Sequence, residues 1–274
     1  MTQKSYVNLL FVVVASLLLT SGLAFKGYQW WYANLSYIKN SKQFLISGIY
    51  QTGPQKEAIS TNQIAELIGL SVDHPTHIYD FDPKDAEKKL LSYPLFKTAK
   101  VTKKKPSHLL VDYSIRTPYV IVKDYPDAVM DEEGVIFPYR QFFSQKIIPE
   151  CFLGLSDESF VEEKKKLSID VLKKASQILQ SWSFSISLVD VSSAFVDSYS
   201  KREIILFIQQ VVDGISFPYY LRLNVLEIEK QLSNFLVLCK ELSKQQKLFI
   251  KLNSQKIPKP KVIDLRLEGM ALID

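Results

Sequence analysis

Residues 95–115 read LFKTAKVTKKKPSHLLVDYSI, and this stretch sets the architecture of the first half of the chain. From Leu109 to Ile115 every second residue is apolar, which is the pattern of a strand with one buried face. Ala99 and Val101 place apolar side chains on one face of an earlier strand, with lysines beside them. A lysine-rich turn joins the two segments. The stretch therefore predicts two consecutive strands of a half-buried sheet.

Two helices are expected directly upstream of these strands. Ser60, followed three residues later by Gln63, forms a capping box, and Gly69 lies where the first helix would end. Asp82 and Pro83 mark the second helix start, because aspartate caps a helix N-terminus and proline suits the first helical position.

A short β-like run at residues 44–49 precedes the two helices, after a polar connection at residues 33–43. Residues 33–118 are therefore expected to form a small α+β domain in the order β-α-α-β-β. A three-stranded sheet with two helices on one face buries enough surface for a domain of about 80 residues.

Residues 119–274 are expected to form a second, larger α+β domain with a mixed sheet. A hairpin at residues 129–137 turns at Gly134, where a residue without a side chain can adopt positive φ. The spacing of apolar residues predicts two amphipathic helices, over residues 160–182 and 228–242. Further strands are expected at residues 184–188, 204–212, 219–223 and 262–267.

The N-terminus carries a long apolar run. Residues 6–25 read YVNLLFVVVASLLLTSGLAF, and about 20 helical residues span about 30 Å, the thickness of a bilayer core. The aromatic cluster at residues 28–32 that follows is suited to a membrane–water interface. Residues 1–32 are therefore expected to form a cytoplasmic tail and a transmembrane helix, whose membrane-spanning residues are Val7, Leu9, Leu10, Phe11, Val12, Val13, Val14, Leu17, Leu18, Leu19 and Leu23.

The same run allows a second interpretation, a cleaved signal peptide. Lys4 would precede the apolar segment 9–19, and residues 22–24 would form a small-x-small cleavage site. The full apolar length and the aromatic cluster favour the anchor. Either segment would export the rest of the chain, although the lysines on both flanks do not favour a cytoplasmic N-terminus by the positive-inside rule.

Composition excludes several other classes of protein. Of the 274 residues, 47% are hydrophobic and 23% charged, which is globular, and the net charge of +5 alone does not indicate a nucleic-acid binder. Nine glycines argue against glycine-rich phosphate loops. Cys151 and Cys239 cannot supply a disulfide framework or a four-cysteine metal site, but they leave open one disulfide in an oxidising compartment. No catalytic motif is present, so neither an enzymatic activity nor a cofactor is expected.

The remaining polar clusters have structural explanations. His74 and His77 flank a proline in a predicted loop and are expected at the surface rather than on a metal. The acids at residues 131–133 are expected to be solvated at a hairpin tip. The densest basic run is expected to be a solvated edge or turn, with attraction to anionic headgroups or to an acidic partner as the alternative; it consists of Lys97, Lys100, Lys103, Lys104 and Lys105.

Several short motifs follow one another in a fixed order along nearly the whole chain. They are Ile64-x-x-Leu67-x-Gly69-Leu70, Asp82-x-x-x-Ala86-x-x-x-Leu90, Tyr93-Pro94-Leu95-Phe96, Arg116-Thr117-Pro118, Val129-Met130-Asp131-Glu132-Glu133-Gly134, Ile148-Pro149 with Leu153-Gly154, and Val262-Ile263-Asp264-Leu265-Arg266-Leu267. Each motif alone is weak, but their order and spacing together are fairly specific, and they resemble the bacterial cell-division family FtsQ/DivIB.

This resemblance implies a POTRA domain at residues 33–118 and a so-called β domain at residues 119–274. It implies a non-enzymatic, single-pass scaffold of the inner membrane, with a cytoplasmic N-terminus and the bulk of the chain in the periplasm at the division septum. Such a protein recruits other division proteins for septal peptidoglycan synthesis. The expected partners are FtsB-like and FtsL-like membrane proteins, and neither nucleic acid nor a small-molecule substrate is expected.

The resemblance also implies a partner-binding site at a sheet edge near the C-terminus, where unpaired N–H and C=O groups can accept another strand. The expected site residues are Asp264, Leu265 and Arg266, which match the family signature, followed by Leu267, Glu268 and Met270. The alternative is that Leu265 and Leu267 simply pack into the core.

A competing function is an exported POTRA-type module that binds polypeptides, or acts as a chaperone, in envelope protein assembly. It predicts binding to unfolded exported chains rather than to small coiled-coil membrane proteins. An exported enzyme is a third class, which no motif supports.

Overall fold

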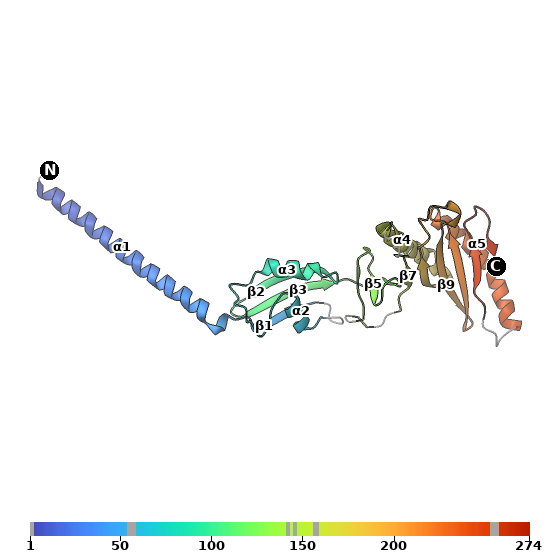
Figure 1. Cartoon of the computed structure of the whole chain (residues 1–274), viewed down its shortest axis with the longest axis horizontal. Coiled ribbons are helices and arrows are strands. Elements are labelled where there is room, and N and C mark those ends of the chain that lie inside the picture. The colour runs from blue at the N-terminus through green and yellow to red at the C-terminus, as the bar shows by residue number, and fades with distance from the viewer. Residues whose placement is uncertain (1–2, 54–58, 141–142, 145–146, 156–158, 253–257) are drawn as a thin grey trace. The chain divides into compact units, whose positions relative to one another are not determined.

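The computed structural model describes residues 3–53, 59–140, 143–144, 147–155, 159–252 and 258–274. Among these residues, one compact unit comprises residues 3–53 and 59–114, and the other comprises residues 115–274 (Figure 1). Each unit is an α+β structure and is described by itself.

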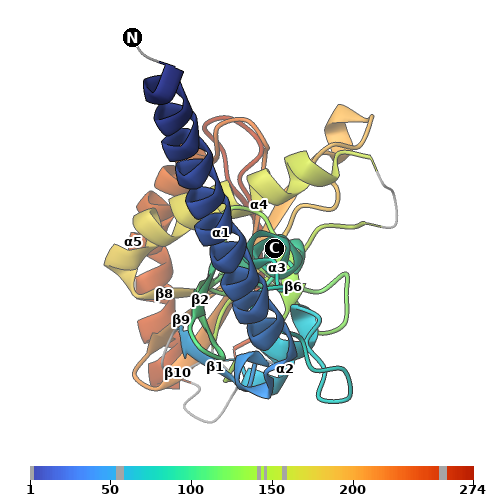
Figure 2. The same cartoon turned by 90° about the vertical axis from the view of Figure 1, so that its left-hand side faces the viewer.

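Helix α1 (Gln3–Asn40) is the first element and is drawn as one continuous helix in Figures 1 and 2. It includes residues 33–40, for which the sequence predicts a polar connection. Among the predicted membrane-spanning residues, those whose side chains lie outside the described part are Val7, Leu9, Leu10, Phe11 and Val12. The others are between 47% and 70% exposed, and they are Val13, Val14, Leu17, Leu18, Leu19 and Leu23. Within the described residues, no helix has the length and apolar character that a membrane crossing requires.

The first unit has the predicted order β-α-α-β-β. Its helices are α2 (Thr61–Leu67) and α3 (Pro83–Ser92), and its strands are β1 (Gly48–Thr52), β2 (Phe96–Lys104) and β3 (His108–Ile115). The sheet order is β1-β3-β2, with β1 parallel to β3. Leu109, Val111 and Tyr113 are buried, as the alternation in the sequence predicts, and they form the floor of the core.

Both predicted helix starts are confirmed. The backbone N–H of Gln63 donates to Ser60 Oγ at 3.3 Å, and the Gln63 side chain accepts from the Ser60 N–H at 3.2 Å, so the capping box is complete. Asp82 Oδ1 accepts from the Lys84 N–H at 2.9 Å. Gly69 follows the first helix with a φ of +81°, which only a residue without Cβ adopts at no cost.

The first strand begins later than residues 44–49 predict. Phe44 ends a 3₁₀-helix, η1 (Lys42–Phe44), whose first turn is capped by Ser41, and its ring packs against His77 and Tyr79. Leu45 makes only an isolated bridge with His77. The backbone of this run bonds to the segment at residues 76–78, with the Ile46 N–H donating to Thr76 and the Ile78 N–H donating to Phe44, and pairing with β3 begins at Gly48.

The second unit is built on a nine-stranded mixed sheet in the order β12-β11-β10-β9-β8-β7-β4-β5-β6. The strands are β4 (Val120–Val122), β5 (Ala128–Met130), β6 (Ile136–Pro138), β7 (Glu150–Phe152), β8 (Phe184–Asp190), β9 (Ile204–Val212), β10 (Ile215–Leu223), β11 (Lys261–Asp264) and β12 (Leu272–Ile273). Neighbours are parallel in the pairs β4–β7, β7–β8 and β10–β11 and antiparallel elsewhere, which confirms the predicted mixed sheet.

Two long helices, α4 and α5, contact each other, and α4 also contacts strand β8 while α5 contacts strand β10. They are α4 (Val161–Leu179), extended by η2 (Gln180–Trp182), and α5 (Ile228–Leu252); a short η3 (Tyr199–Lys201) precedes β9. The helices lie where the periodicity predicts, although α5 runs ten residues further than residue 242. Their buried faces carry Leu172, Leu232 and Phe235 onto the apolar side of the sheet.

The hairpin at residues 129–137 is confirmed, with Gly134 at a φ of +85°. Its acids are not all solvated, because Asp131 is only 5% exposed. The Asp131 carboxylate accepts from the backbone N–H groups of Glu133 and Val135, each at 2.9 Å, and from Arg116 at 2.7 Å. Asp131 is therefore a structural brace of this hairpin.

The end of the chain departs most from expectation. The predicted strand 262–267 stops at Asp264, and the chain turns through Gly269 at a φ of +71° before it returns as β12. Strand β12 pairs with β11, so that Ile273 lies opposite Ile263 and Leu272 lies opposite Asp264. Residues 267–270 therefore lie in a turn, and β12 forms this edge of the sheet.

Candidate functional site

Strand β12 presents an apolar edge at one end of the nine-stranded sheet. Leu272 and Ile273 are 59% and 48% exposed. Asp274 and Val262 exchange both backbone hydrogen bonds, at 3.0 and 3.3 Å, so the backbone of Asp274 faces β11. Because alternate residues of a strand point their N–H and C=O in opposite directions, the backbone groups of Ile273 face the open edge.

The predicted site residues are divided between the last strands and the turn. Asp264 ends β11, and Leu265, at 3% exposure, is buried in the core. Leu267 and Met270 are 50% and 61% exposed and do not pack into the core. They are joined by a hydrogen bond from the Met270 N–H to the Leu267 carbonyl at 3.3 Å.

A network of four charged residues holds the start of this turn. Arg266 donates to both oxygens of Asp264, with its shortest contact at 2.7 Å. Arg222 of β10 contacts Asp264 at 3.3 Å and Glu203 at 2.6 Å. Arg266 also reaches Glu203 at 3.4 Å. The Asp264-Leu265-Arg266 motif thus ties three segments together and positions the turn that leads to β12.

The ionisation of Asp264 makes this network sensitive to pH. Burial opposes ionisation, but the hydrogen bonds from Arg266 and the charges of Arg266 and Arg222 outweigh it and lower the pKa of the carboxyl. A carboxyl with a lowered pKa stabilises the folded state above the ordinary carboxyl range, about pH 4, and this stabilisation is lost as the pH falls through the folded-state pKa.

We therefore expect the melting temperature to drop more steeply between about pH 5 and pH 2 in the unchanged protein than in Asp264→Asn. Asparagine keeps the shape of the side chain but cannot titrate. Thermal unfolding of both proteins, followed by circular dichroism across this pH range, makes the comparison. Parallel curves for the two proteins would show that Asp264 does not contribute.

A second contact holds the far side of the turn. Lys230, in the first turn of α5, contacts Glu268 at 2.5 Å, and it also reaches Glu227 at 3.5 Å. Both side chains of the Lys230–Glu268 pair are largely exposed, so the pair orients the turn more than it stabilises the fold.

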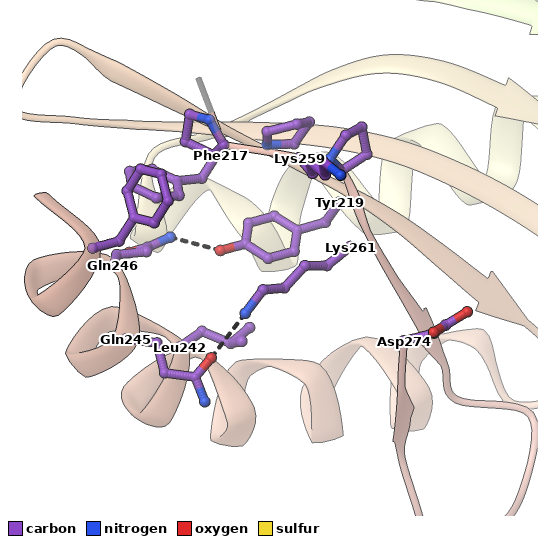
Figure 3. Close-up of a pocket in the computed structure, with 12 residues that line it drawn as sticks. Phe217, Tyr219, Leu242, Gln245, Gln246, Lys259, Lys261 and Asp274 are labelled. Carbon is purple, nitrogen blue, oxygen red and sulfur yellow. Dashed lines mark hydrogen bonds between the residues drawn. The ribbon is translucent and has the colours of Figure 1, made fainter. Parts of the chain in front are cut away.

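A pocket of about 560 Å³ lies between α5, the beginning of β10 and the segment that leads into β11 (Figure 3). Its walls include Phe217, Phe249 and Pro258, and Asp274, which follows β12, also lines it. The β10–β11 ladder begins only at Tyr219 and Lys261. The Arg222 carbonyl accepts from the Leu265 N–H, so by alternation the backbone of Pro218 also faces this segment, and proline has no N–H with which to extend the ladder.

The floor of the pocket is polar and fully satisfied. Gln246, which is 4% exposed, donates to the Tyr219 hydroxyl and to Gln210, each at 2.8 Å. Burial, opposed by the Gln246 hydrogen bond, raises the pKa of Tyr219. Lys261 donates to Gln245 at 2.8 Å across the pocket (Figure 3). The pocket therefore combines apolar walls with fixed polar groups, and Asp274, the residue after β12, lines it.

The cysteines and histidines do not form a site in the described part of the chain. Cys151 and Cys239 are buried as free thiols, and desolvation raises the pKa of each to about 12, which makes them unreactive. His74 is exposed, and His77 packs between Phe44 and Tyr79. The described residues contain no cluster of three or more potential metal ligands.

The basic run lies on β2 and the turn after it. Lys97, Lys100 and Lys104 are exposed and Lys103 is half-buried. The Lys105 ammonium lies 5.3 Å from the centre of the Tyr79 ring. Because β2 is an edge strand of its sheet, the prediction that the basic run lies at a solvated edge or turn is confirmed.

A β-α-α-β-β unit joined to a mixed-sheet unit defines a two-domain α+β protein of the POTRA-containing class. In agreement, residues 53–112 match the family described as POTRA domain, FtsQ-type. The chain thus carries an FtsQ-type POTRA domain, and this match supports the FtsQ/DivIB family recognised in the motifs. No curated protein sequence matches the chain as a relative.

Sequence reasoning missed β12 and the pocket. A strand of two residues is too short to show an alternating pattern, although Gly269 before the apolar pair 272–273 marks a turn. Pro218, which lacks a backbone N–H, is a signal in the sequence that the β10–β11 ladder stops before this residue.

Proposed function

We propose that this protein is a non-enzymatic scaffold of the cell-division machinery, which recruits other division proteins through the β12 edge of its second unit. The FtsQ-type POTRA domain supports the connection with division. The single observation that carries the recruitment role is the exposed strand β12, whose outward backbone groups at Ile273 can pair with a partner strand.

The arrangement around β12 suits capture of an extended segment. The network at Asp264 and the Lys230–Glu268 contact fix the turn from both sides, so less conformational entropy is lost when a partner strand adds. The main chain would supply affinity, while the apolar side chains of Leu272 and Ile273 and the neighbouring pocket would select side chains of the partner. FtsB-like and FtsL-like membrane proteins are the proposed partners.

We further propose that α1 anchors the protein in the inner membrane, with the N-terminus in the cytoplasm and both units in the periplasm. The support is the uncharged run at residues 6–25 and the aromatic cluster after it. An anchor confines protein and partner to one membrane, which raises their effective concentration, so modest strand-addition affinity suffices.

Crosslinking in intact membranes tests the proposed function. A tagged full-length chain is expected to capture small single-span coiled-coil proteins, and the Ile273→Pro variant is expected to lose them. Capture of unfolded exported chains or barrel precursors instead would favour the polypeptide-binding alternative. Extraction of the same membranes with alkaline carbonate tests the anchor, since an anchored chain stays in the membrane pellet and a cleaved one is released.

A further inference from the structure

The pocket beside the start of β10 has an apolar end built from two secondary-structure elements. Phe217 of β10 and Phe249 of α5 meet at this end, with ring centres 5.9 Å apart and ring planes nearly perpendicular, at 80°. Leu242 and Pro258 are buried and also line the pocket. Flat apolar groups pack favourably against the faces and edges of aromatic rings. This end therefore suits the apolar body of a ligand.

A buried chain of amides fixes the floor of the pocket. Gln246 donates to the Tyr219 hydroxyl and to Gln210, each at 2.8 Å, and Gln210 in turn donates to the Trp182 carbonyl at 2.9 Å. Both N–H groups of the Gln246 amide are thus taken by acceptors of the protein itself. The charged donors that remain for a ligand are the lysines of the pocket.

The charged residues that line the pocket are two lysines and one aspartate. Lys261 donates to the neutral side chain of Gln245, at 2.8 Å, and Lys259 is exposed (Figure 3). Neither lysine forms an ion pair with any residue in the part of the chain that the structure describes. Asp274 lies at the far end of the pocket from Gln246 (Figure 3). The pocket therefore carries an excess of positive charge, which attracts anions.

The volume of the pocket, about 560 Å³, suits a whole small molecule. Pockets of about 300–1,000 Å³ with apolar walls and a few fixed polar groups are typical of small-molecule sites. The apolar end and the nearby lysines require the occupant to be amphipathic, with an apolar body and an anionic group.

We propose that this pocket binds a small aromatic carboxylate, whose ring packs against Phe217 and Phe249 and whose carboxylate pairs with the Lys261 ammonium. A carboxylate is a stronger acceptor than the neutral amide of Gln245, so it would displace Gln245 from Lys261. Lys259 would supply a second positive charge. This binding is independent of the proposed recruitment role, because it requires no partner strand at β12.

A series of probes that differ only in charge tests this proposal. Cinnamate, cinnamyl alcohol and cinnamylammonium are titrated separately into the full-length chain in detergent micelles. Binding is followed by carbon-13 methyl NMR at Leu242, and free probe concentrations are measured by equilibrium dialysis because the probes also enter micelles. Cinnamate is expected to bind with a Kd below about 1 mM and at least about fivefold more tightly than the alcohol. The ammonium compound is expected to bind least.

Charge-matched variants locate the group that binds the anion. Lys261→Gln is expected to weaken cinnamate binding about 5- to 10-fold and to leave binding of the alcohol within about twofold. Lys244→Gln removes the same charge from an exposed residue of α5 that does not line the pocket, so cinnamate binding should stay within about twofold. Lys261→Arg keeps the charge and is expected to retain binding within about threefold.

Three results would overturn the proposal: no shift at Leu242 with about 10 mM cinnamate, equal or tighter binding of the alcohol or the ammonium compound, or undiminished cinnamate binding by Lys261→Gln. If a variant disturbs the fold, which methyl signals of leucines outside the pocket would reveal, the probe series on the unchanged protein decides. The Ile273→Pro variant is expected to bind cinnamate normally, so failure of this proposal and failure of the proposed function are distinguishable.

Discussion

Replacing Ile273 by proline is expected to abolish partner capture at β12 while the second unit stays folded. The backbone of Ile273 faces the open edge, whereas Leu272 and Asp274 face β11. Proline removes the outward N–H and places its ring where a partner strand would lie. We expect partner affinity to fall about tenfold or more, measured by titration of a labelled partner segment.

Two matched variants make this result specific. Ile273→Ala keeps the N–H and removes only side-chain contacts, so it is expected to weaken binding less than proline does. Leu272→Pro removes an N–H that faces β11 and is expected to detach β12 itself, which faster exchange at the amide of Val262 would report. Retained capture by a folded Ile273→Pro protein would exclude β12 as the pairing edge.

Removing the Asp131 carboxylate is expected to be the most destabilising of the substitutions considered. Asp131→Ala leaves the N–H groups of Glu133 and Val135 without their acceptor. It also removes the buried carboxylate that forms the ion pair with Arg116. The expected loss in the free energy of unfolding of the second unit is about 2–4 kcal/mol. Urea unfolding, followed by hydrogen exchange at the amides of β5 and β6, measures it.

Glu133→Ala is the matched control for this prediction. The Glu133 side chain also contacts Arg116, at 2.8 Å, but it is 50% exposed. Solvent screens this pair, so the expected loss is less than about 1 kcal/mol. Similar losses for the two variants would mean that the charge of Arg116, rather than the buried turn at Asp131, stabilises the hairpin.

Features that depend on a few neighbouring residues could be predicted from the sequence. The Ser60–Gln63 capping box, the Asp82 cap and the turn at Gly134 are each defined within four residues. The long helices α4 and α5 follow from the repeated spacing of apolar residues along one face. These local rules suffice for the α+β class and for the order of elements in the first unit.

Features that join distant residues could not be predicted. The burial of Asp131 depends on Arg116, fifteen residues away, and the network at Asp264 draws Glu203 and Arg222 from other strands. The sequence predicts the pairing edge at Leu267, Glu268 and Met270, because the motif before them has a strand pattern, but Gly269 turns the chain back. Which strand lies at the edge of a sheet depends on how all the strands pair, and this pairing is seen only in the folded structure.

The sequence by itself therefore determined the long helices α4 and α5, the order of elements in the first unit, the α+β class and the FtsQ-type POTRA domain, since local hydrogen bonds and apolar periodicity are encoded in neighbouring residues. Only the tertiary structure decided that β12 ends the second sheet, that a pocket lies between α5 and the start of β10, and that the Val101 N–H of β2 donates to Glu87 of α3. These sites arise where segments far apart in the chain meet, and their geometry depends on how the sheets assemble around the core.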